Sequence, residues 1–186
     1  FDTKNLIICV SRLEHKNGTH DLIAAAKLLN DEKIDFKIVV CGSGSQKEEL
    51  EKMIIDFGLK DKIFLLGSVL YEKIPQYVAM ADIFIRPSLA EGFGNVFVEA
   101  MAAGAAVIGT PVGGIPDFLR DGINGLFCEP GNPKDIAEKI KKLMRDKNLA
   151  QKVITNGVKT AREEYDWVGI AKRVRDLYLK LITNSK

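Results

Sequence analysis

The chain is poor in the residues that build metal centres and crosslinks. It contains three cysteines and two histidines, and it has no Cys-x-x-Cys pair, so a structural zinc site is not expected. Cys9, Cys41 and Cys128 each stand in an apolar run, which predicts buried thiols in a reducing compartment rather than disulfides. The sequence therefore predicts no metal and no bound cofactor.

Long apolar runs and charge of one sign are also missing. No stretch approaches the roughly 20 apolar residues of a membrane span, and no signal peptide opens the chain, which predicts a cytoplasmic protein. The 27 basic and 25 acidic residues leave a net charge of +2. That surplus is too small for general electrostatic binding of nucleic acid or of a membrane surface. Any binding by basic residues is therefore expected to be local.

The length of 186 residues and the 46% hydrophobic content suit one compact domain with a sizeable core. The chain begins at Phe1 and enters a strand-like run at Leu6, so we expect it to be one domain of a longer protein. No internal repeat, low-complexity tract or linker divides it. Residues 1–186 are therefore interpreted as a single domain.

Short apolar runs alternate with segments of helical period. Strands are predicted at residues 6–10, 36–41, 63–66, 83–85 and 106–108, with a short one at 125–128. Helices are predicted at residues 20–29, 46–57, 74–80 and 98–103. Apolar strands in a βαβ alternation indicate a parallel sheet with helices on both faces. The predicted fold class is α/β, a Rossmann-like three-layer sandwich with a mostly parallel sheet and C-terminal helices.

The pattern is wholly helical from Asn132, a suitable N-cap before Pro133. The last helix repeats an apolar spacing and keeps its basic residues toward solvent. The apolar residues are Ile170, Val174, Leu177, Tyr178 and Leu181, and the basic ones are Lys172, Arg173, Arg175 and Lys180. We interpret it as a solvated amphipathic helix, with contact to a partner domain as the alternative.

Ligands of open α/β sheets bind beyond the carboxyl ends of the strands. Five loops meet that description, at residues 11–18, 42–44, 67–69, 87–95 and 110–114, and we expect them to converge on one edge. Arg12 and Lys16 in the first loop could clamp a diphosphate, or they could be ordinary solvated cations. The Gly42-Ser-Gly44 turn is a weak signal alone, because Lys47 replaces the third glycine of a dinucleotide fingerprint.

The most informative segment runs from Glu91 to Glu99, where two carboxylates bracket a Gly-Phe-Gly turn before a helix. Free amides at the positive end of a helix bind anions, and carboxylates accept hydrogen bonds from hydroxyls. A glycosidase pair about 5 to 9.5 Å apart would leave the anion site unexplained. Carboxylates that only complement the helix dipole are a further alternative. A ligand that carries both phosphate groups and sugar hydroxyls would suit this segment, which favours a nucleotide sugar.

These residues resemble the C-terminal, donor-binding domain of retaining GT-B glycosyltransferases, the glycosyl transferases group 1 or family four. The resemblance covers nearly the whole chain, and the block from Glu91 to Glu99 is its most specific part. The other motifs are Val10-Ser-Arg-Leu13 with Lys16-Asn-Gly18, Val40-Cys-Gly-Ser-Gly44, Leu66-Gly-Ser-Val69, Ala81-Asp-Ile-Phe-Ile-Arg-Pro-Ser88, Pro111-Val-Gly-Gly-Ile-Pro116 and Asn124-Gly-Leu126. The resemblance implies one half of a GT-B fold, with the N-terminal acceptor domain absent from this chain.

The resemblance also implies roles for individual residues. Arg12 and Lys16 would neutralise the leaving diphosphate in place of a metal ion, and Glu91 would hold the transferred sugar. Asn17 departs from the family, in which a lysine often precedes the loop glycine. The implied donor-binding residues are Gly42, Gly67 and Val69 near the base, the turn of Gly92, Phe93, Gly94, Asn95 and Val96 at the phosphate and sugar, and Glu99 at the ribose.

The predicted function is donor binding in a metal-independent hexosyltransferase that uses a UDP- or GDP-sugar. The isolated domain is expected to bind donor but to transfer little, because the family's active site lies between two domains. The expected partners are the nucleotide-diphospho-sugar and the missing domain, not nucleic acid, and any membrane contact would be peripheral and made by the absent domain. A sugar-nucleotide epimerase or hydrolase and a non-catalytic sugar-nucleotide sensor are the alternatives.

Overall fold

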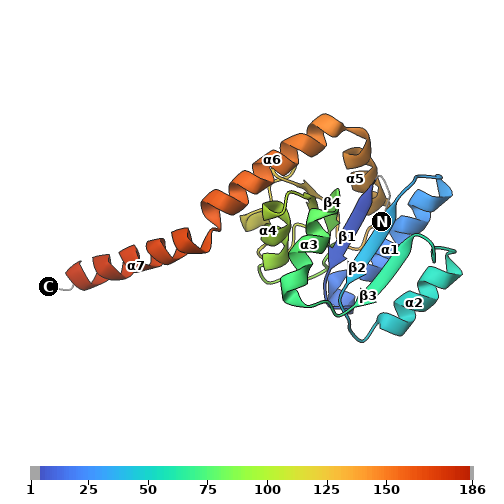
Figure 1. The fold of residues 1–186 in the computed structure, drawn as a ribbon, viewed down its shortest axis with the longest axis horizontal. Coiled ribbons are helices and arrows are strands. Elements are labelled where there is room, and N and C mark those ends of the chain that lie inside the picture. The colour runs from blue at the N-terminus through green and yellow to red at the C-terminus, as the bar shows by residue number, and fades with distance from the viewer. Residues whose placement is uncertain (1–4, 185–186) are drawn as a thin grey trace.

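Six short strands form one parallel sheet in the computed structural model, which describes residues 5–184 (Figure 1). They are β1 (Leu6–Val10), β2 (Lys37–Cys41), β3 (Ile63–Gly67), β4 (Ile83–Ile85), β5 (Ala106–Gly109) and β6 (Leu126–Phe127). The order in the sheet is β3-β2-β1-β4-β5-β6, and every neighbouring pair is parallel. The predicted α/β class with a Rossmann-like parallel sheet is confirmed.

Helices cover both faces of this sheet. They are α1 (Thr19–Asp31), α2 (Lys47–Asp56), α3 (Ile74–Ala79), α4 (Asn95–Ala102), α5 (Pro133–Arg145) and α6 (Lys147–Glu164). A further helix, α7 (Trp167–Asn184), follows them, and three 3-10 turns lie in the loops: η1 (His15–Asn17), η2 (Tyr71–Lys73) and η3 (Ile115–Asp117). Side chains alternate along each strand, so Ile7 joins the core under α1, α2 and α5. Ile8 joins the core under α3, α4 and α6. Burial on both faces explains why the strands are continuous apolar runs.

The sheet has a topological switch point between β1 and β4. The chain moves outward from β1 to β2 and β3, then returns to place β4 on the other side of β1. A crevice at the carboxyl ends of the strands forms where the order reverses, and it is the usual ligand site of such sheets. The basic loop after β1 and the Glu91 segment after β4 are therefore neighbours.

The three cysteines are free and buried, as their apolar surroundings predict. Burial raises the pKa of the Cys41 thiol to about 11 and that of the Cys128 thiol to about 12. Burial also raises the pKa of Cys9. All three thiols are therefore neutral at physiological pH and act as small core side chains.

The last helix, α7, projects away from the rest of the chain (Figure 1). Val174, Leu177 and Tyr178 on its apolar side are 48%, 59% and 63% exposed, so the apolar side faces solvent together with the basic residues. This favours the alternative that α7 contacts a partner domain. No helix within residues 5–184 has both the length and the apolar character needed to cross a membrane.

Removal of residues 167–186 is expected to leave the remaining fold intact. No α7 side chain that the structure describes is buried, so the free energy of unfolding should change by less than about 1 kcal/mol. The free energy of unfolding is measured by urea titration with circular dichroism. Tryptophan fluorescence cannot be used, because the truncation removes Trp167, the only tryptophan of the chain. A chain ending at Arg145 also loses the buried Val153 and Ala161 of α6 and should be clearly destabilised. Equal losses from both truncations would show that α7 supports the core.

Candidate functional site

The loops after β1, β2 and β3 meet through close backbone contacts. Gly42 has φ +147°, and a Cβ there would lie 1.8 Å from the carbonyl oxygen of Ser11, so only glycine permits this approach. Gly42 N also donates to Gly67 O at 2.8 Å. Glu14 accepts hydrogen bonds from Ser45 N and Ser45 Oγ at 3.1 and 2.8 Å, and these bonds hold its pKa below the ordinary value.

The loop after β4 lies against the other side of the basic loop. The carbonyl of Lys16 accepts hydrogen bonds from Leu89 N and Ala90 N at 2.8 and 3.3 Å. Gly18 has φ +69°, and a Cβ there would lie 1.9 Å from Pro87 O. Backbone hydrogen bonds and a close backbone contact therefore join the basic loop to the loop that leads into the Glu91 segment.

The loop after β5 is the fifth loop at this edge, and it contacts the Glu91 segment. Gly114 N donates to Gly92 O at 2.6 Å, and a Cβ on Gly113 would lie 1.8 Å from Glu91 O. Contacts between backbones thus join all five loops that the sequence assigns to this edge of the sheet.

Arg12 and Lys16 present exposed side chains at this edge. Neither forms an ion pair within residues 5–184. Asn17 is 1% exposed and donates from Nδ2 to Arg12 O at 2.6 Å. Of the two residues before Gly18, Lys16 and not Asn17 therefore has an exposed side chain at this edge.

The N-terminus of α4 carries unpaired backbone donors. Gly94 is its N-cap, with φ +82° and no side-chain cap. In the described part of the chain, the amides of Phe93, Gly94, Asn95 and Val96 donate to no protein acceptor. The helix begins at Asn95 and not at Val98 as expected, so two of these amides belong to its first turn. Free amides at the positive end of a helix suit an anion.

Glu91 is not a free carboxylate. Its Oε1 accepts a hydrogen bond from Gly92 N at 3.0 Å, and its Oε2 lies 2.5 Å from Nη2 of Arg86. Both side chains of this ion pair are largely buried, at 14% and 13% exposure. Arg86 stands in the Ala81–Ser88 motif of the resemblance, but sequence reasoning gave it no role, although a cation directly after the apolar strand β4 could have drawn attention to it.

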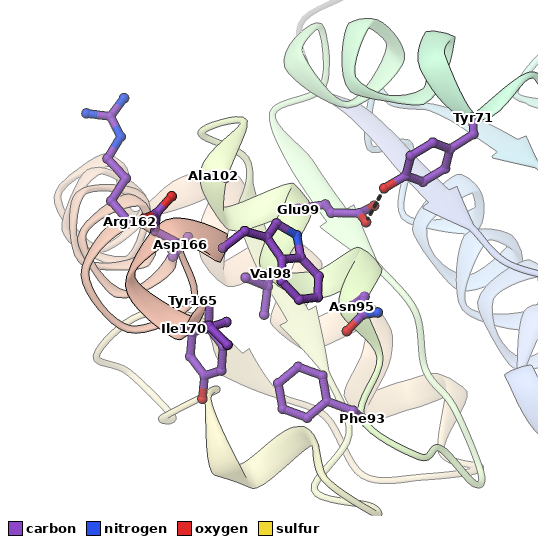
Figure 2. A pocket seen from close by; sticks show the side chains of 12 residues that line it. Tyr71, Phe93, Asn95, Val98, Glu99, Ala102, Arg162, Tyr165, Asp166 and Ile170 are labelled. Atoms are coloured by element: carbon purple, nitrogen blue, oxygen red, sulfur yellow. Dashed lines mark hydrogen bonds between the residues drawn. The ribbon is translucent and has the colours of Figure 1, made fainter. Parts of the chain in front are cut away.

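Glu99 lies in α4 and also has a partner. Its Oε1 accepts a hydrogen bond from the hydroxyl of Tyr71 at 2.9 Å, and Figure 2 shows the two side chains pointing toward each other. The hydrogen bond and the nearby carboxylate charge raise the pKa of Tyr71. Tyr71, in η2 after β3, is another residue that sequence reasoning did not identify.

A cavity of about 560 Å³ opens between α4 and the junction of α6 with α7 (Figure 2). It brings together three predicted residues, Phe93, Asn95 and Glu99, with Tyr165 and Ile170. The other predicted site residues do not line it: Arg12, Lys16, Glu91, Gly42, Gly67, Val69, Gly92, Gly94 and Val96. The predicted residues therefore divide between this cavity and the loops at the sheet edge. In the part of the chain that the structure describes, no group of three His, Cys, Asp or Glu side chains could hold a metal ion.

The chain is thus a Rossmann-like α/β domain with a basic loop and an uncapped helix N-terminus at the carboxyl edge of its sheet, the edge where such sheets usually bind ligands. The family model of glycosyl transferases group 1 matches residues 1–160. The chain belongs to this family, as the resemblance predicted.

Relatives with curated names cover the chain well. It is 33% identical over 178 residues to an uncharacterized glycosyltransferase of Methanocaldococcus jannaschii, and the aligned region covers 95% of this chain and 45% of that protein. It is 31% identical over 173 residues to the phosphatidylinositol N-acetylglucosaminyltransferase gpi3 subunit of Schizosaccharomyces pombe, covering 92% of this chain and 37% of that one. The chain thus spans less than half the length of these relatives.

Solved structures share the fold. Anabaena HepE in complex with UDP superposes with a TM-score of 0.86 and 26% identity, over 94% of this chain and 48% of that one. The C-terminal domain of a glycosyl transferase group 1 protein from Francisella tularensis has a TM-score of 0.81 and 32% identity, over 88% of this chain and 87% of that one. The structural neighbours are GT-B glycosyltransferases.

Proposed function

We propose that this chain is the donor-binding half of a retaining, metal-independent glycosyltransferase that moves a hexosyl unit from a UDP- or GDP-sugar. The observation that carries the proposal is the uncapped N-terminus of α4 at the same sheet edge as the unpaired cations Arg12 and Lys16. Backbone amides and two cations together provide the charge complement of a diphosphate. HepE has been solved in complexes with UDP and with UDP-glucose, which supports a nucleotide sugar as the ligand.

Each part of the donor then has a partner of suitable chemistry. Arg12 and Lys16 neutralise the diphosphate as it leaves, which is the work that a metal ion would otherwise do. Glu99 accepts hydrogen bonds from the ribose, and Glu91 accepts them from the sugar. The base lies near Gly42, Gly67 and Val69, and the donor's phosphates and sugar lie against the amides of residues 93–96.

The acceptor half of the enzyme is assigned to the missing N-terminal domain. We assign the exposed apolar side of α7 to contact with that domain, because the chain spans less than half of its relatives. The isolated chain then binds donor but transfers little, since closure of two domains is needed to exclude water. The free, buried thiols fit a protein of the reducing cytoplasm.

Replacement of Glu99 tests donor binding directly. Isothermal titration of the chain with UDP, GDP and their sugars, in EDTA, should show binding of one nucleotide series. Glu99→Ala should bind that series about 10- to 100-fold more weakly, because a carboxylate that accepts from ribose hydroxyls is lost. Glu163→Ala, which removes an exposed glutamate of α6, is the matched control and should bind as wild type does. No binding by wild type, or unchanged binding by Glu99→Ala, would reject the assignment.

Product analysis of the full-length protein tests the reaction class. A glycoside with the anomeric configuration of the donor sugar, seen by NMR, is the expected product. Inversion at C2 would indicate an epimerase, and release of free sugar would indicate a hydrolase.

A further inference from the structure

A buried charged cluster lies beneath the loops that follow β1 and β4. Arg86, the first residue after β4, places Nη2 2.5 Å from Glu91 Oε2 and 2.9 Å from Asn17 Oδ1. Asn17 in turn donates from Nδ2 to the backbone carbonyl of Arg12 at 2.6 Å. One guanidinium group therefore connects the carboxylate assigned to the sugar with the loop assigned to the diphosphate.

The ion pair removes a source of repulsion from the proposed site. An unpaired carboxylate at position 91 would repel a neighbouring diphosphate, and a buried charge without a partner is costly. Arg86 neutralises the Glu91 carboxylate without using all of its acceptor capacity, because each carboxylate oxygen has two lone pairs. Oε1 accepts one bond, from Gly92 N, and Oε2 has no aligned hydrogen-bond donor in the described part of the chain. Because Oε2 is itself buried against Arg86, the acceptor site that remains for a sugar hydroxyl is the second lone pair of Oε1.

We propose that Arg86 is a positioning residue that fixes the Glu91 carboxylate for recognition of the transferred sugar. The proposal rests on the proposed function, because Glu91 meets a sugar only if a nucleotide sugar binds at this edge. Arg86 Nη2 contacts both Glu91 and Asn17, and the rigid, planar guanidinium fixes the position of this nitrogen, whereas a lysine ammonium on a flexible stem would hold it less firmly. The basic loop itself is also held by the bonds from Leu89 N and Ala90 N to Lys16 O. The effect of Arg86 therefore falls on the sugar and not on the nucleotide.

The contribution of the sugar is separated from that of the nucleotide by comparing two dissociation constants, one for the nucleotide sugar and one for the nucleoside diphosphate. Wild type and variants are titrated with UDP and UDP-glucose, and with GDP and GDP-mannose, and the pair that wild type binds is used. In Arg86→Met, the Kd of the nucleotide sugar divided by that of the nucleoside diphosphate should rise about tenfold, as expected for a lost hydrogen bond to a charged group. The Kd of the diphosphate alone should change less than about threefold. Arg86→Lys should give an intermediate ratio.

Two further variants distinguish positioning from general support of the fold. Arg120→Met removes an exposed ion pair with Glu164, whose charged atoms are 3.5 Å apart, and should keep the wild-type ratio. The double variant Arg86→Met/Glu91→Gln should raise the ratio no further than the larger single effect, because both changes remove one interaction.

An unchanged ratio in Arg86→Met would overturn the proposal, as would a proportional loss of affinity for both ligands, which indicates a merely structural role. If Arg86→Met does not fold, an unchanged ratio in both Arg86→Lys and Glu91→Gln overturns it. A wild-type chain that binds no nucleoside diphosphate overturns the proposed function as well. That outcome differs from the others, all of which require a wild type that binds.

Discussion

Gly18→Ala should lose about 3 kcal/mol of folding free energy and most donor affinity. The φ of +69° at this position disfavours any residue with a Cβ, at roughly 1–2 kcal/mol. The steric clash costs more, because a Cβ would lie 1.9 Å from the carbonyl oxygen of Pro87. A backbone carbonyl cannot move aside as a flexible side chain can. The loops after β1 and β4 must then separate, which moves the basic loop away from the Glu91 segment.

Gly122→Ala is the matched control for this prediction. Gly122 has a φ of +68° and nothing within 4 Å of a Cβ, so its replacement carries the backbone strain without the clash. It should lose about 1 kcal/mol and keep wild-type donor affinity. Urea unfolding and isothermal titration of both variants measure the two quantities. Equal effects from Gly18→Ala and Gly122→Ala would mean that the close contact between the loops is not needed for binding.

The sheet could be predicted because its strands are buried on both faces. β1 and β4 have the boundaries predicted from their apolar runs, and β2, β3 and β5 differ by one residue. Burial on both sides removes polar residues from a strand, so its ends are marked by the first polar residue or glycine. The strand β6 is shorter than its apolar run, because only Leu126 and Phe127 pair with β5.

The start of α4 could not be predicted with the same precision. Helix N-termini are recognised by a side chain that caps the free amides, but Gly94 has no side chain and caps by its left-handed backbone alone. The helix therefore begins three residues before the predicted start at Val98. That difference matters for function, because the amides of Asn95 and Val96 at the helix start belong to the proposed anion site.

The partners of the site carboxylates also lay beyond the sequence. Tyr71 and Glu99 are 28 positions apart, and Arg86, which pairs with Glu91 in the same loop, also contacts Asn17, 69 positions away. Neither long-range contact leaves a local pattern. The contact of Arg86 with Asn17 depends on β4 lying next to β1, and the alternation of strands and helices indicates a parallel sheet without giving its strand order. Position in the sheet therefore decides which charges meet.

Arg12→Ala should weaken binding of the nucleoside diphosphate by about 10- to 100-fold, the loss expected for charge-assisted bonds from a guanidinium. The stability of the fold should not change, because the Arg12 side chain is exposed and forms no ion pair within residues 5–184. Isothermal titration at two salt concentrations measures the affinity, and urea unfolding measures the stability. The difference between wild type and variant should shrink at high salt, since exposed charges are screened.

The identity of the contacted group follows from comparing ligands and replacements. Loss of Arg12 should leave the affinity for the nucleoside without phosphates unchanged, because the guanidinium is assigned to the diphosphate alone. Arg12→Lys should recover only part of the lost affinity, since it restores the charge but not the two-pronged geometry. Arg145→Ala removes an exposed arginine in the last turn of α5 and should bind as wild type does. An equal loss in Arg12→Ala and Arg145→Ala would indicate a diffuse effect of net charge, and the diphosphate would then need another partner.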